Sequence, residues 1–491
     1  MKKKLFGIVF ATIVILLMST TAFAMSGEGT ENNPYLIETE EDFSAITNST
    51  GKYYKLMIDV SIEESLGNFN GTLDGNSFTL STTQNYIFES NSGAIKNLTV
   101  ASGILVDRNE NNGILDNCKT LKNMLFLTNN GDVKNSTTNN TMLGDINYGT
   151  ITGCSAVFDE NYNLYTLSLI TDNYGSVKSS NCVCNDVEII KSTGLVSQTD
   201  ISLSFDGICE NNYETGEISQ CFTSGSIYLW TTNNNTGVHS AYTYFYGICR
   251  TNRGTVSQSY SDCDVILRAS ASNSQAFSIS SFSGICGMDG AGVVENCYSK
   301  GSCHISTANY VYVRGISNAS GKVTNCHSTT NVSIPNNVGS NYRGIYGVGG
   351  KERSSSYYLA DNMPSNSTNS DKYGISKTSD ELKIQSTYES WNFETIWGID
   401  SEKNDGYPYL KWQFEESIHP EDTTTYTLGD TNNDGTIDVR DVMLMRRYIA
   451  GGYGVQLLEK VVDVNQDGEI DTQDIIFLRR FIAGGYGVEL K

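Results

Sequence analysis

The stretch Gly113-Ile114-Leu115-Asp116-Asn117-Cys118 decides the fold, because versions of it recur throughout the middle of the chain. Each version places a glycine first, an Ile, Val or Leu two residues later, and often a cysteine three residues after that. Five copies keep the cysteine, at 113–118, 149–154, 216–221, 292–297 and 321–326. Weaker copies begin at Gly93, Gly131, Gly175 and Gly254, where Leu98, Ser136, Ser180 and Ser259 replace it. Self-similarity of this kind predicts a repeat architecture rather than a single globular core.

A second signature precedes each unit in the later half of the middle region. It reads Gly-Ile-Cys or Gly-Ile-Ser, and it occurs at 207–209, 247–249, 284–286 and 315–317. One coil therefore contains two strand-and-turn pieces. The glycines of the first signature lie 18 to 41 residues apart, which suits short β-coils with insertions rather than helical repeats. Since such a coil cannot bury its own apolar face, neighbouring coils must stack. We expect a mainly β, right-handed β-helix-like solenoid with one continuous core.

The repeats resemble the GLUG motif of extracellular bacterial β-helix proteins, with Gly-Ile-Cys where that family has Gly-Leu-Val-Gly. The resemblance implies GLUG-like solenoid repeats over 91–350. Segments at 29–37 and 69–76 resemble the entry that opens many such β-helices, so residues 25–90 are predicted to form the N-terminal cap. The aromatic segment from Trp391 to Leu410 resembles the closing piece, which predicts a C-terminal cap over 351–412. Caps are needed because an open sheet edge pairs with other chains.

The N-terminus has the pattern of a secretory signal peptide. Three lysines precede an apolar run over 5–18, and an Ala-Phe-Ala cleavage pattern ends at Ala24, so a signal peptide is predicted at 1–24. The run is too short to span a membrane, and no later stretch approaches the roughly 20 apolar residues needed. We therefore expect a secreted, extracellular protein without membrane insertion. The formal net charge of -22 excludes nucleic acid as an expected partner, because phosphate binding needs clustered Lys and Arg.

The chain contains 12 cysteines, most of them in or near the two signatures. Equivalent positions in a solenoid stack above one another, which predicts a buried ladder of small, weakly polar thiols. Disulfides are the alternative, because the cysteine count is even and the chain has an export signal. The sequence leaves the redox state open. Cys182-Val183-Cys184 has one intervening residue and so lacks the Cys-x-x-Cys spacing of a zinc knuckle.

Two acidic blocks near the C-terminus, 430–441 and 463–474, have the spacing of calcium-binding loops. Each places oxygen-bearing side chains at loop positions 1, 3, 5 and 12, a backbone carbonyl at position 7, and a glycine at position 6 for the sharp turn. Both loops end in Asp, where the usual pattern ends in Glu. Two blocks 33 residues apart predict two bound calcium ions. The predicted ligands are Asp430, Asn432, Asp434, Thr436 and Asp441 in one loop, and Asp463, Asn465, Asp467, Glu469 and Asp474 in the other.

An amphipathic helix is predicted to follow each loop. Both helices end in the string Ile-Ala-Gly-Gly-Tyr-Gly-Val, and glycine pairs are ordinary helix stops. The apolar stripes are Val442, Met445 and Ile449 in the first helix, and Ile475, Leu478 and Ile482 in the second.

Two loop-helix units with an arginine pair late in each helix closely resemble a type I dockerin. The resemblance implies a small all-α dockerin over 427–491, preceded by a linker at 413–426. In that family the module binds a cohesin domain of a cellulosome scaffold protein, chiefly through loop positions 10 and 11 and the basic pair. The residues implicated in cohesin binding are Val439, Arg440, Arg446, Arg447, Thr472, Gln473, Arg479 and Arg480.

The dockerin resemblance implies that the rest of the chain works in or around a polysaccharide-degrading, cellulosome-associated complex. One role is a non-catalytic component whose solenoid binds polysaccharide or another extracellular partner. Aromatic residues alternate along predicted strands at 228–230, 242–246 and 310–312, which would present rings on one face for sugar stacking. Packing of these rings against the sheet is the simpler alternative.

A β-helical polysaccharide lyase or glycoside hydrolase is the second role, and a cell-surface adhesin is the third. Hydrolysis needs two carboxylates flanking the scissile bond, and stacked coils could supply them from Asp74, Asp107, Asp116 or Asp145. Nothing in the linear sequence pairs these residues, and the Asn-Thr-Asp and Gly-His-Gly motifs of β-helical polygalacturonases are absent. The sequence therefore leaves open whether the chain is an enzyme, and it assigns no catalytic residue.

Overall fold

The computed structural model divides into two compact units, residues 1–413 and 414–491. The predicted signal peptide, most of the predicted linker and part of the first acidic loop lie outside the residues that the structure describes. Within the described residues, none of the helices has the length and apolar character needed to cross a membrane. The described residues are 25–46, 50–159, 166–193, 199–288, 291–317, 321–339, 341–350, 352–364, 374–414, 427–431, 437, 439–449 and 459–482.

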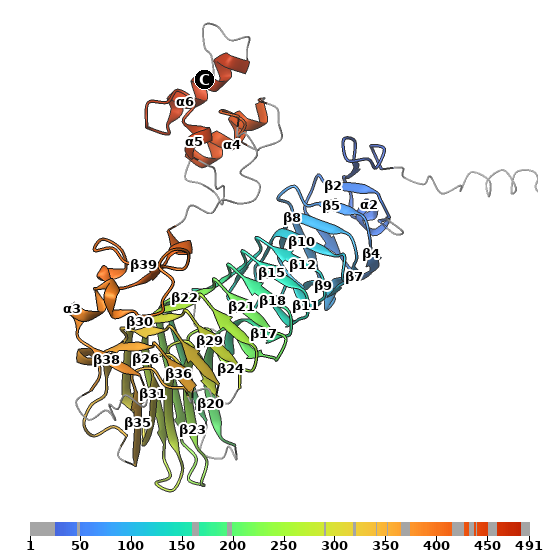
Figure 1. Cartoon of the computed structure of the whole chain (residues 1–491). Coiled ribbons are helices and arrows are strands. Elements are labelled where there is room, and N and C mark those ends of the chain that lie inside the picture. The colour runs from blue at the N-terminus through green and yellow to red at the C-terminus, as the bar shows by residue number, and fades with distance from the viewer. Residues whose placement is uncertain are drawn as a thin grey trace, which may run out of the picture. The chain divides into compact units, whose positions relative to one another are not determined.

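The first unit is a parallel β-solenoid, as predicted (Figure 1). A regular coil contributes one strand to each of three columns, and each strand pairs in parallel with the strands of the coils before and after it. Parallel neighbours cannot be joined by a tight hairpin, so the remainder of each coil serves as the crossover between them.

The strands and short helices of this unit are as follows. The first column contains β1 (Tyr35–Ile37), β2 (Tyr53–Leu56), β5 (Thr72–Asp74), β8 (Ala94–Val100), β10 (Ile114–Thr120), β12 (Asp132–Lys134), β15 (Thr150–Thr152), β18 (Ser176–Lys178), β21 (Glu217–Ser219), β25 (Thr255–Ser257), β29 (Val293–Glu295), β32 (Lys322–Thr324) and β36 (Glu352–Ser354). Strands β8 and β10 continue into the second column, which also contains β3 (Val60–Ile62), β6 (Thr79–Thr82), β13 (Thr137–Asn139), β16 (Ser155–Phe158), β19 (Asn181–Thr193), β22 (Phe222–Asn233), β26 (Tyr260–Ala271), β30 (Tyr298–Thr307), β33 (His327–Ser328), β34 (Asn331–Ser333), β37 (Tyr357–Leu359) and β38 (Ile375–Lys377). The third column contains β4 (Leu66–Phe69), β7 (Tyr86–Asn91), β9 (Ile104–Asn109), β11 (Phe126–Asn129), β14 (Gly144–Asn147), β17 (Thr166–Asn173), β20 (Ile201–Asn212), β23 (Ala241–Tyr246), β24 (Cys249–Asn252), β27 (Ser278–Ser283), β28 (Cys286–Met288), β31 (Tyr310–Arg314) and β35 (Tyr342–Tyr346). Outside the columns lie α2 (Glu40–Ser44), α3 (Ser379–Leu382), β39 (Trp397–Gly398), β40 (Tyr409–Leu410) and four 3-10 helices, η1 (Ala360–Asn362), η2 (Gln385–Thr387), η3 (Asn404–Gly406) and η4 (Lys411–Gln413).

The first glycine signature builds the first column, and its copies stack in register. Asp132 pairs with Ile114 on one side and Thr150 on the other, so residues 18 positions apart are neighbours. Insertions lengthen the later coils, and Ser176 pairs with Glu217, 41 positions away. The apolar residue of each copy is fully buried, namely Ile95, Leu115, Val133, Ile151, Val177, Ile218, Val256, Val294 and Val323.

Each signature then turns sharply through a left-handed residue, which directs the cysteine position into the core. The positive φ angles belong to Asn97, Asn117, Asn135, Gly153, Ser179, Gln220, Gln258, Asn296 and Asn325. Cysteine and serine largely alternate at the next position. The backbone N–H of Cys154 donates to Ser180 Oγ at 3.1 Å, and Cys118 and Cys221 make the same bond with the serine of the next coil. All twelve cysteines are buried free thiols, so the predicted ladder is present.

The third column contains a ladder of buried asparagines that the sequence analysis did not predict. In six consecutive steps, the side-chain N–H of one asparagine donates to the side-chain oxygen of the next at 2.8 to 2.9 Å. Most members also donate to the carbonyl of the glycine that starts the following signature. The ladder consists of Asn91, Asn109, Asn129, Asn147, Asn173, Asn212 and Asn252.

The second signature marks a bend in the third column of the later, wider coils. Its glycines lie where two backbones come close together, because a Cβ on Gly247 would fall 1.9 Å from the carbonyl oxygen of Gly284. The cysteines that follow stack inside the bend, and the Sγ atoms of Cys209 and Cys249 are 3.6 Å apart.

The aromatic segment near the end of this unit packs against the side of the later coils. Trp412 Nε1 donates to the carbonyl of Gln258 at 2.9 Å, and Trp397 Nε1 donates to Asn296 Oδ1 at 3.3 Å. His327 Nε2 lies 2.9 Å from the carbonyl of Pro408. A second apolar cluster forms there from Tyr298, Tyr357, Leu359, Leu382, Tyr388, Trp391, Trp397 and Leu410.

The second unit is helical, as predicted, and contains α4 (Val439–Ile449), α5 (Glu459–Val462) and α6 (Thr472–Ile482). Both bounds of α6 follow those of α4 by 33 residues (472 − 439 and 482 − 449), so the two helices occupy equivalent places in the repeat. Of the predicted stripes, Val442, Met445 and Leu478 are buried in its core and Ile475 packs against it, whereas Ile449 lies outside the core cluster and Ile482 is exposed. The buried apolar residues of this cluster are Val442, Met445, Val462, Val464 and Leu478.

Candidate functional site

The second acidic loop, 463–474, is closed by its last residue. Asp474 is fully buried, and its two carboxylate oxygens accept hydrogen bonds from the N–H groups of Asn465 (3.2 Å) and Asp471 (2.9 Å). The side chain of Asp471 accepts a bond of 2.6 Å from the N–H of Gln473, as a helix N-cap does. The closure of the loop and the start of α6 therefore depend on the same few carboxylates.

The other end of this loop also collects backbone donors. Asp463 accepts hydrogen bonds from the N–H of Asp467 at 3.2 Å and of Gly468 at 3.0 Å. Gly468 has a φ of +86°, a left-handed conformation that a side chain would strain, which explains glycine at loop position 6. Asn465 Nδ2 donates to Asp467 Oδ2 at 2.8 Å, and the N–H of Glu469 donates to Asp467 Oδ1 at 2.9 Å.

The first acidic loop shows the same closure in the part that the structure describes. Asp441 is fully buried, and its Oδ1 accepts a hydrogen bond of 2.8 Å from the N–H of Thr431. Asp430 is also buried. The predicted ligands Asn432, Asp434 and Thr436 lie outside the described residues.

The donor chemistry of both loops fits calcium. Every predicted ligand offers a carboxylate, amide, hydroxyl or carbonyl oxygen, which is the set that a hard cation with six to eight ligands prefers. A buried carboxylate is costly without compensating charge, and two N–H bonds compensate Asp474 only in part. Among the described residues, no group of three or more His, Cys, Asp or Glu side chains is arranged to hold a metal ion. The ligand set and the count of two ions remain predictions.

The predicted docking residues lie at the two ends of the equivalent helices. Thr472 and Gln473 begin α6 and are exposed, and Arg479 and Arg480 are exposed in its last turn. Arg446 is exposed at the corresponding place in α4. Val439, Arg440 and Arg447 belong to α4, and their side chains lie outside the described residues.

The aromatic residues proposed for sugar stacking on the solenoid are mostly engaged in packing. Tyr242, Tyr244 and Tyr246 on β23 have near-parallel rings with centroids 6.0 and 5.9 Å apart, and Tyr246 is buried. The guanidinium of Arg268 lies 3.9 Å from the ring centroid of Trp230 and covers one of its faces. Other ring contacts join Tyr228 to Trp230, Tyr310 to Phe277, and Tyr312 to Arg314. These contacts favour the packing alternative.

The four carboxylates considered for hydrolysis do not form one cluster. Asp74 and Asp116 lie in the first column two coils apart, with Lys96 between them in the register. Each accepts a side-chain hydrogen bond from an asparagine of the next coil, at 3.1 and 3.0 Å. Asp107 lies near Arg108 at 3.6 Å, and Asp145 belongs to β14 in the third column. In this structure Asp74 and Asp116 stabilise turns.

A buried polar row that the sequence analysis missed directly precedes the glycines of the Gly-Ile bend. Tyr246 pairs with Ser283 in the register, and Asp206 follows the paired residues Phe205 and Phe245. Asp206 Oδ1, the Tyr246 hydroxyl and Ser283 Oγ are buried, and none of them has a hydrogen-bond partner in the described part of the chain.

Asp206 is the buried acid of this row. Its Oδ2 accepts a hydrogen bond of 3.0 Å from Ser204. Burial raises the pKa of Asp206 to about 8, although Arg250 acts in the opposite direction. Arg250 itself forms an ion pair of 2.9 Å with Glu210. The row therefore holds a carboxyl group that stays protonated near neutral pH.

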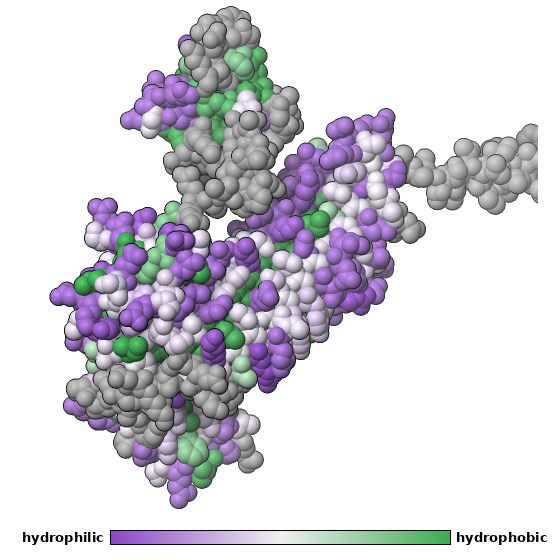
Figure 2. Space-filling view, viewed as in Figure 1, coloured by the Kyte–Doolittle hydropathy of each residue, from purple (hydrophilic) through white to green (hydrophobic). Residues whose placement is uncertain are grey.

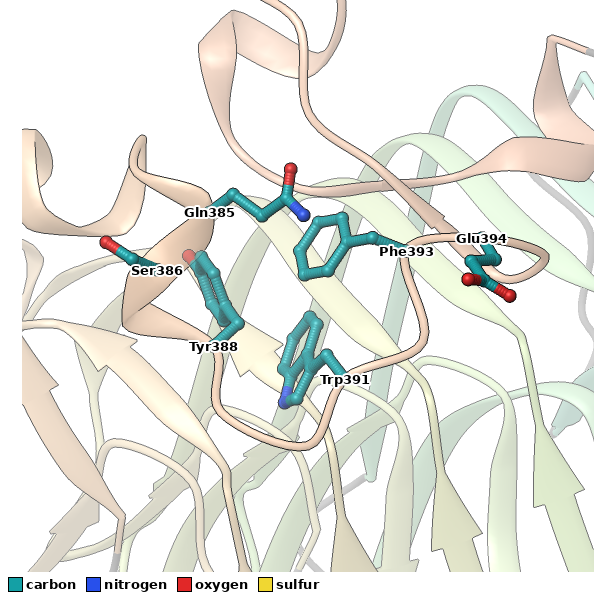
Figure 3. Close-up of a pocket in the computed structure, with 6 residues that line it drawn as sticks. All are labelled: Gln385, Ser386, Tyr388, Trp391, Phe393 and Glu394. Atoms are coloured by element: carbon teal, nitrogen blue, oxygen red, sulfur yellow. The ribbon is translucent and has the colours of Figure 1, made fainter.

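An open pocket lies in the aromatic segment that covers the later coils (Figure 3). Its volume is about 620 Å³, and it is lined by Gln385, Ser386, Tyr388, Trp391, Phe393 and Glu394. On the face of the solenoid shown in Figure 2, hydrophilic residues predominate and hydrophobic ones gather in small patches.

Two of the missed features have a signal in the sequence. Each asparagine of the ladder lies two or four residues before the glycine of a first signature, as in Asn129-Asn130-Gly131 and Asn147-Tyr148-Gly149. Asp206 directly precedes the glycine of a second signature, where the other copies have Tyr246, Ser283 and Arg314. The pocket has no comparable repeat signal.

A solved structure and a protein-family model each match this chain. The crystal structure of a candidate immunoglobulin A1 protease from Bacteroides ovatus matches with 13% sequence identity and a TM-score of 0.28, covering 79% of this chain and 94% of that chain. No curated protein matches the chain. The family model of the dockerin type I domain matches residues 428–483. Its match includes both acidic loops, α4, α5 and α6. The chain therefore carries a type I dockerin domain at residues 428–483.

Proposed function

We propose that this protein is a secreted component of a cellulosome-type assembly. Its dockerin domain implies a cohesin partner, and type I dockerins bind calcium. The observation that carries the proposal is the pair of equivalent loop-helix units, each closed by a buried aspartate, Asp441 or Asp474. Two calcium ions would complete the loops, hold the helix starts in place and so present the docking residues on ordered helices. Residues 1–24 would direct export of the chain.

The arrangement of α4 and α6 further supports docking in two orientations. The equivalent helices carry equivalent basic pairs, Arg446-Arg447 and Arg479-Arg480, so either helix could meet the same cohesin surface. Val439-Arg440 and Thr472-Gln473 differ in charge, so the two orientations need not be equally populated. Titration calorimetry with a cognate cohesin tests this. Charge reversal of either pair should weaken binding in part, and reversal of both should abolish it. If one reversal alone removes all binding while the other leaves it unchanged, only one face is used.

The solenoid would place a binding surface for polysaccharide, or for another extracellular partner, within the assembly. Its repeats, which we interpret as GLUG-like, stack coil upon coil into a continuous scaffold. Affinity electrophoresis of the full chain in gels that contain plant polysaccharides tests this role. Retardation by at least one of them supports it, and unretarded migration in all of them contradicts it.

A polysaccharide lyase or glycoside hydrolase is the second candidate function. Asp206 has the raised pKa of a proton donor, but its side chain is fully buried, so in this structure it does not contact a substrate. Reducing-end and unsaturated-product assays on the same polysaccharides separate the two candidates. Product formation by the parent chain would support the enzyme, and binding without product formation would contradict it. An adhesin role would be supported by binding to cells in the absence of any scaffold.

A further inference from the structure

We propose that the pocket in the aromatic segment, between η2 and the loop that carries Phe393 and Glu394, binds a neutral sugar residue of a polysaccharide (Figure 3). The inference rests on the proposed polysaccharide-binding role and gives that role a location. It differs from the stacking sites expected on the solenoid strands.

The aromatic walls of the pocket are held rigidly. Trp391 Nε1 donates a hydrogen bond of 2.8 Å to the carbonyl of Ser355, and the Tyr388 hydroxyl donates one of 2.6 Å to the carbonyl of Leu382. Since these polar atoms are already bonded elsewhere, both rings present hydrocarbon to the cavity. A preformed wall reduces the entropy that a ligand loses on binding.

The ring geometry suits the flat face of a pyranose. The Trp391 and Phe393 rings are inclined by only 21°, with centroids 6.4 Å apart, and the Tyr388 ring lies 4.5 Å from Trp391. Phe393 is only partly buried, whereas Tyr388 and Trp391 are 4% and 7% exposed. Phe393 is thus the ring with a face left for a ligand.

Polar groups on the rim suit the hydroxyls of that sugar. Gln385, Ser386 and Glu394 are exposed, and the structure gives their side chains no hydrogen bond with any described residue. In Figure 3 the Gln385 amide lies next to the Phe393 ring, whereas the Ser386 hydroxyl and the Glu394 carboxylate point away from the three rings. The Gln385 amide offers both a donor and an acceptor, as sugar hydroxyls require.

The charge and the volume of the pocket indicate which class of ligand it can bind. The six lining residues include one carboxylate and no Lys or Arg, so an acidic sugar would meet repulsion without a cationic partner. The net charge of -22 on the whole chain further disfavours binding of an acidic sugar. A volume of about 620 Å³ lies in the range of small-ligand sites.

The test measures binding of the calcium-loaded full chain to soluble xyloglucan, glucomannan, arabinoxylan and polygalacturonate by affinity electrophoresis and titration calorimetry. Phe393→Ala should weaken binding to at least one neutral polysaccharide about tenfold, and Gln385→Ala several-fold. The matched controls, Ile384→Ala beside the pocket and Tyr242→Ala on β23, should bind within twofold of the parent. Because Gln385 and Glu394 are exposed, Gln385→Ala and Glu394→Gln keep the test valid if Phe393→Ala does not fold.

If Phe393→Ala and Gln385→Ala bind like the parent, or if only Tyr242→Ala loses binding, the pocket is not the binding site. The polysaccharide-binding role would remain in either case. A preference for polygalacturonate would overturn the neutral class of ligand. If the parent binds none of the four polysaccharides, the polysaccharide-binding role fails, and the pocket proposal fails with it.

Discussion

Buried asparagines in the solenoid donate to one another at 2.8 to 2.9 Å, coil after coil, whereas the buried aspartates of the C-terminal module accept N–H bonds from their own loops. In the solenoid, each ladder member except Asn252 donates to an asparagine of the next coil. In the module, the buried side chains of Asp441 and Asp474 are bonded by backbone N–H groups of their own loops. The asparagine ladder is therefore bonded within the solenoid itself, whereas we expect the module to need a cation.

Removal of calcium should give the largest difference between the two units. A ligand that binds only the folded state stabilises it by about 2.7 kcal/mol at 100 times its Kd, and each loop loses that contribution on chelation. Scanning calorimetry of the full chain with calcium and with EDTA should therefore show one transition lowered or lost and the solenoid transition unmoved. Equal shifts in both, or no shift in either, would contradict the comparison.

Asp206 is an exception within the solenoid, and its effect depends on pH. Its pKa of about 8 lies above the unfolded value near 3.8, so the folded state holds the proton more tightly. Stability should fall by up to about 1.4 kcal/mol per pH unit as pH rises from about 4 to 8, because the unfolded chain releases this proton first. Urea unfolding should show that Asp206→Asn flattens this dependence. If the unfolding free energy of the variant depends on pH as steeply as that of the parent, the pKa of Asp206 is not raised in the folded state.

Breaking the asparagine ladder should have a smaller, pH-independent effect. Asn129 accepts from Asn109 and donates to Asn147, so Asn129→Ala leaves both neighbours buried with one bond missing. A loss of about 2 to 3 kcal/mol is expected from unsatisfied buried groups. Asn130→Ala is the matched control, because Asn130 is adjacent, half-buried and outside the ladder. Equal unfolding free energies for the two variants would remove the ladder's structural role.

The smallest effect is expected at the cysteine positions. Ser136 and Ser180 already occupy the places next to Cys154 in the stack, so Cys154→Ser should cost less than about 1 kcal/mol. Burial raises the pKa of Cys154 to about 12, which keeps the thiol protonated. Thiol labelling of the folded chain should therefore be slow, and a reductant should leave the solenoid transition unchanged. Disulfide-linked peptides in a non-reduced digest would overturn the free-thiol ladder.

The repeat signature predicted the parts of the fold that depend on local pattern. Glycine followed by a buried Ile, Val or Leu placed the first column, and the cysteine position placed the thiol ladder. The acidic loops and helices of the module could also be predicted from the sequence, because a calcium-binding loop requires certain ligand types at fixed spacings. Ile482 departs from its predicted stripe because the helix end is exposed.

The lateral packing, the pocket and the buried acid depend on contacts between residues that long insertions separate in the sequence. A local sequence pattern does not predict such contacts. Trp412 bonds Gln258 across 154 residues, so the lateral packing of the aromatic segment could not be read from a local motif. The same holds for the pocket beside Trp391. Asp206 becomes a buried acid only because the register places it beside Tyr246, in a coil whose length is set by an insertion.

Titration calorimetry of the full chain against a cognate cohesin tests the central claim most directly. With calcium the parent should bind with one-to-one stoichiometry, and EDTA should abolish the heat signal while circular dichroism shows the β-solenoid unchanged. A chain truncated after Gln413 should not bind under either condition. Binding that persists in EDTA, or that survives the truncation, would contradict calcium-dependent docking through the C-terminal module.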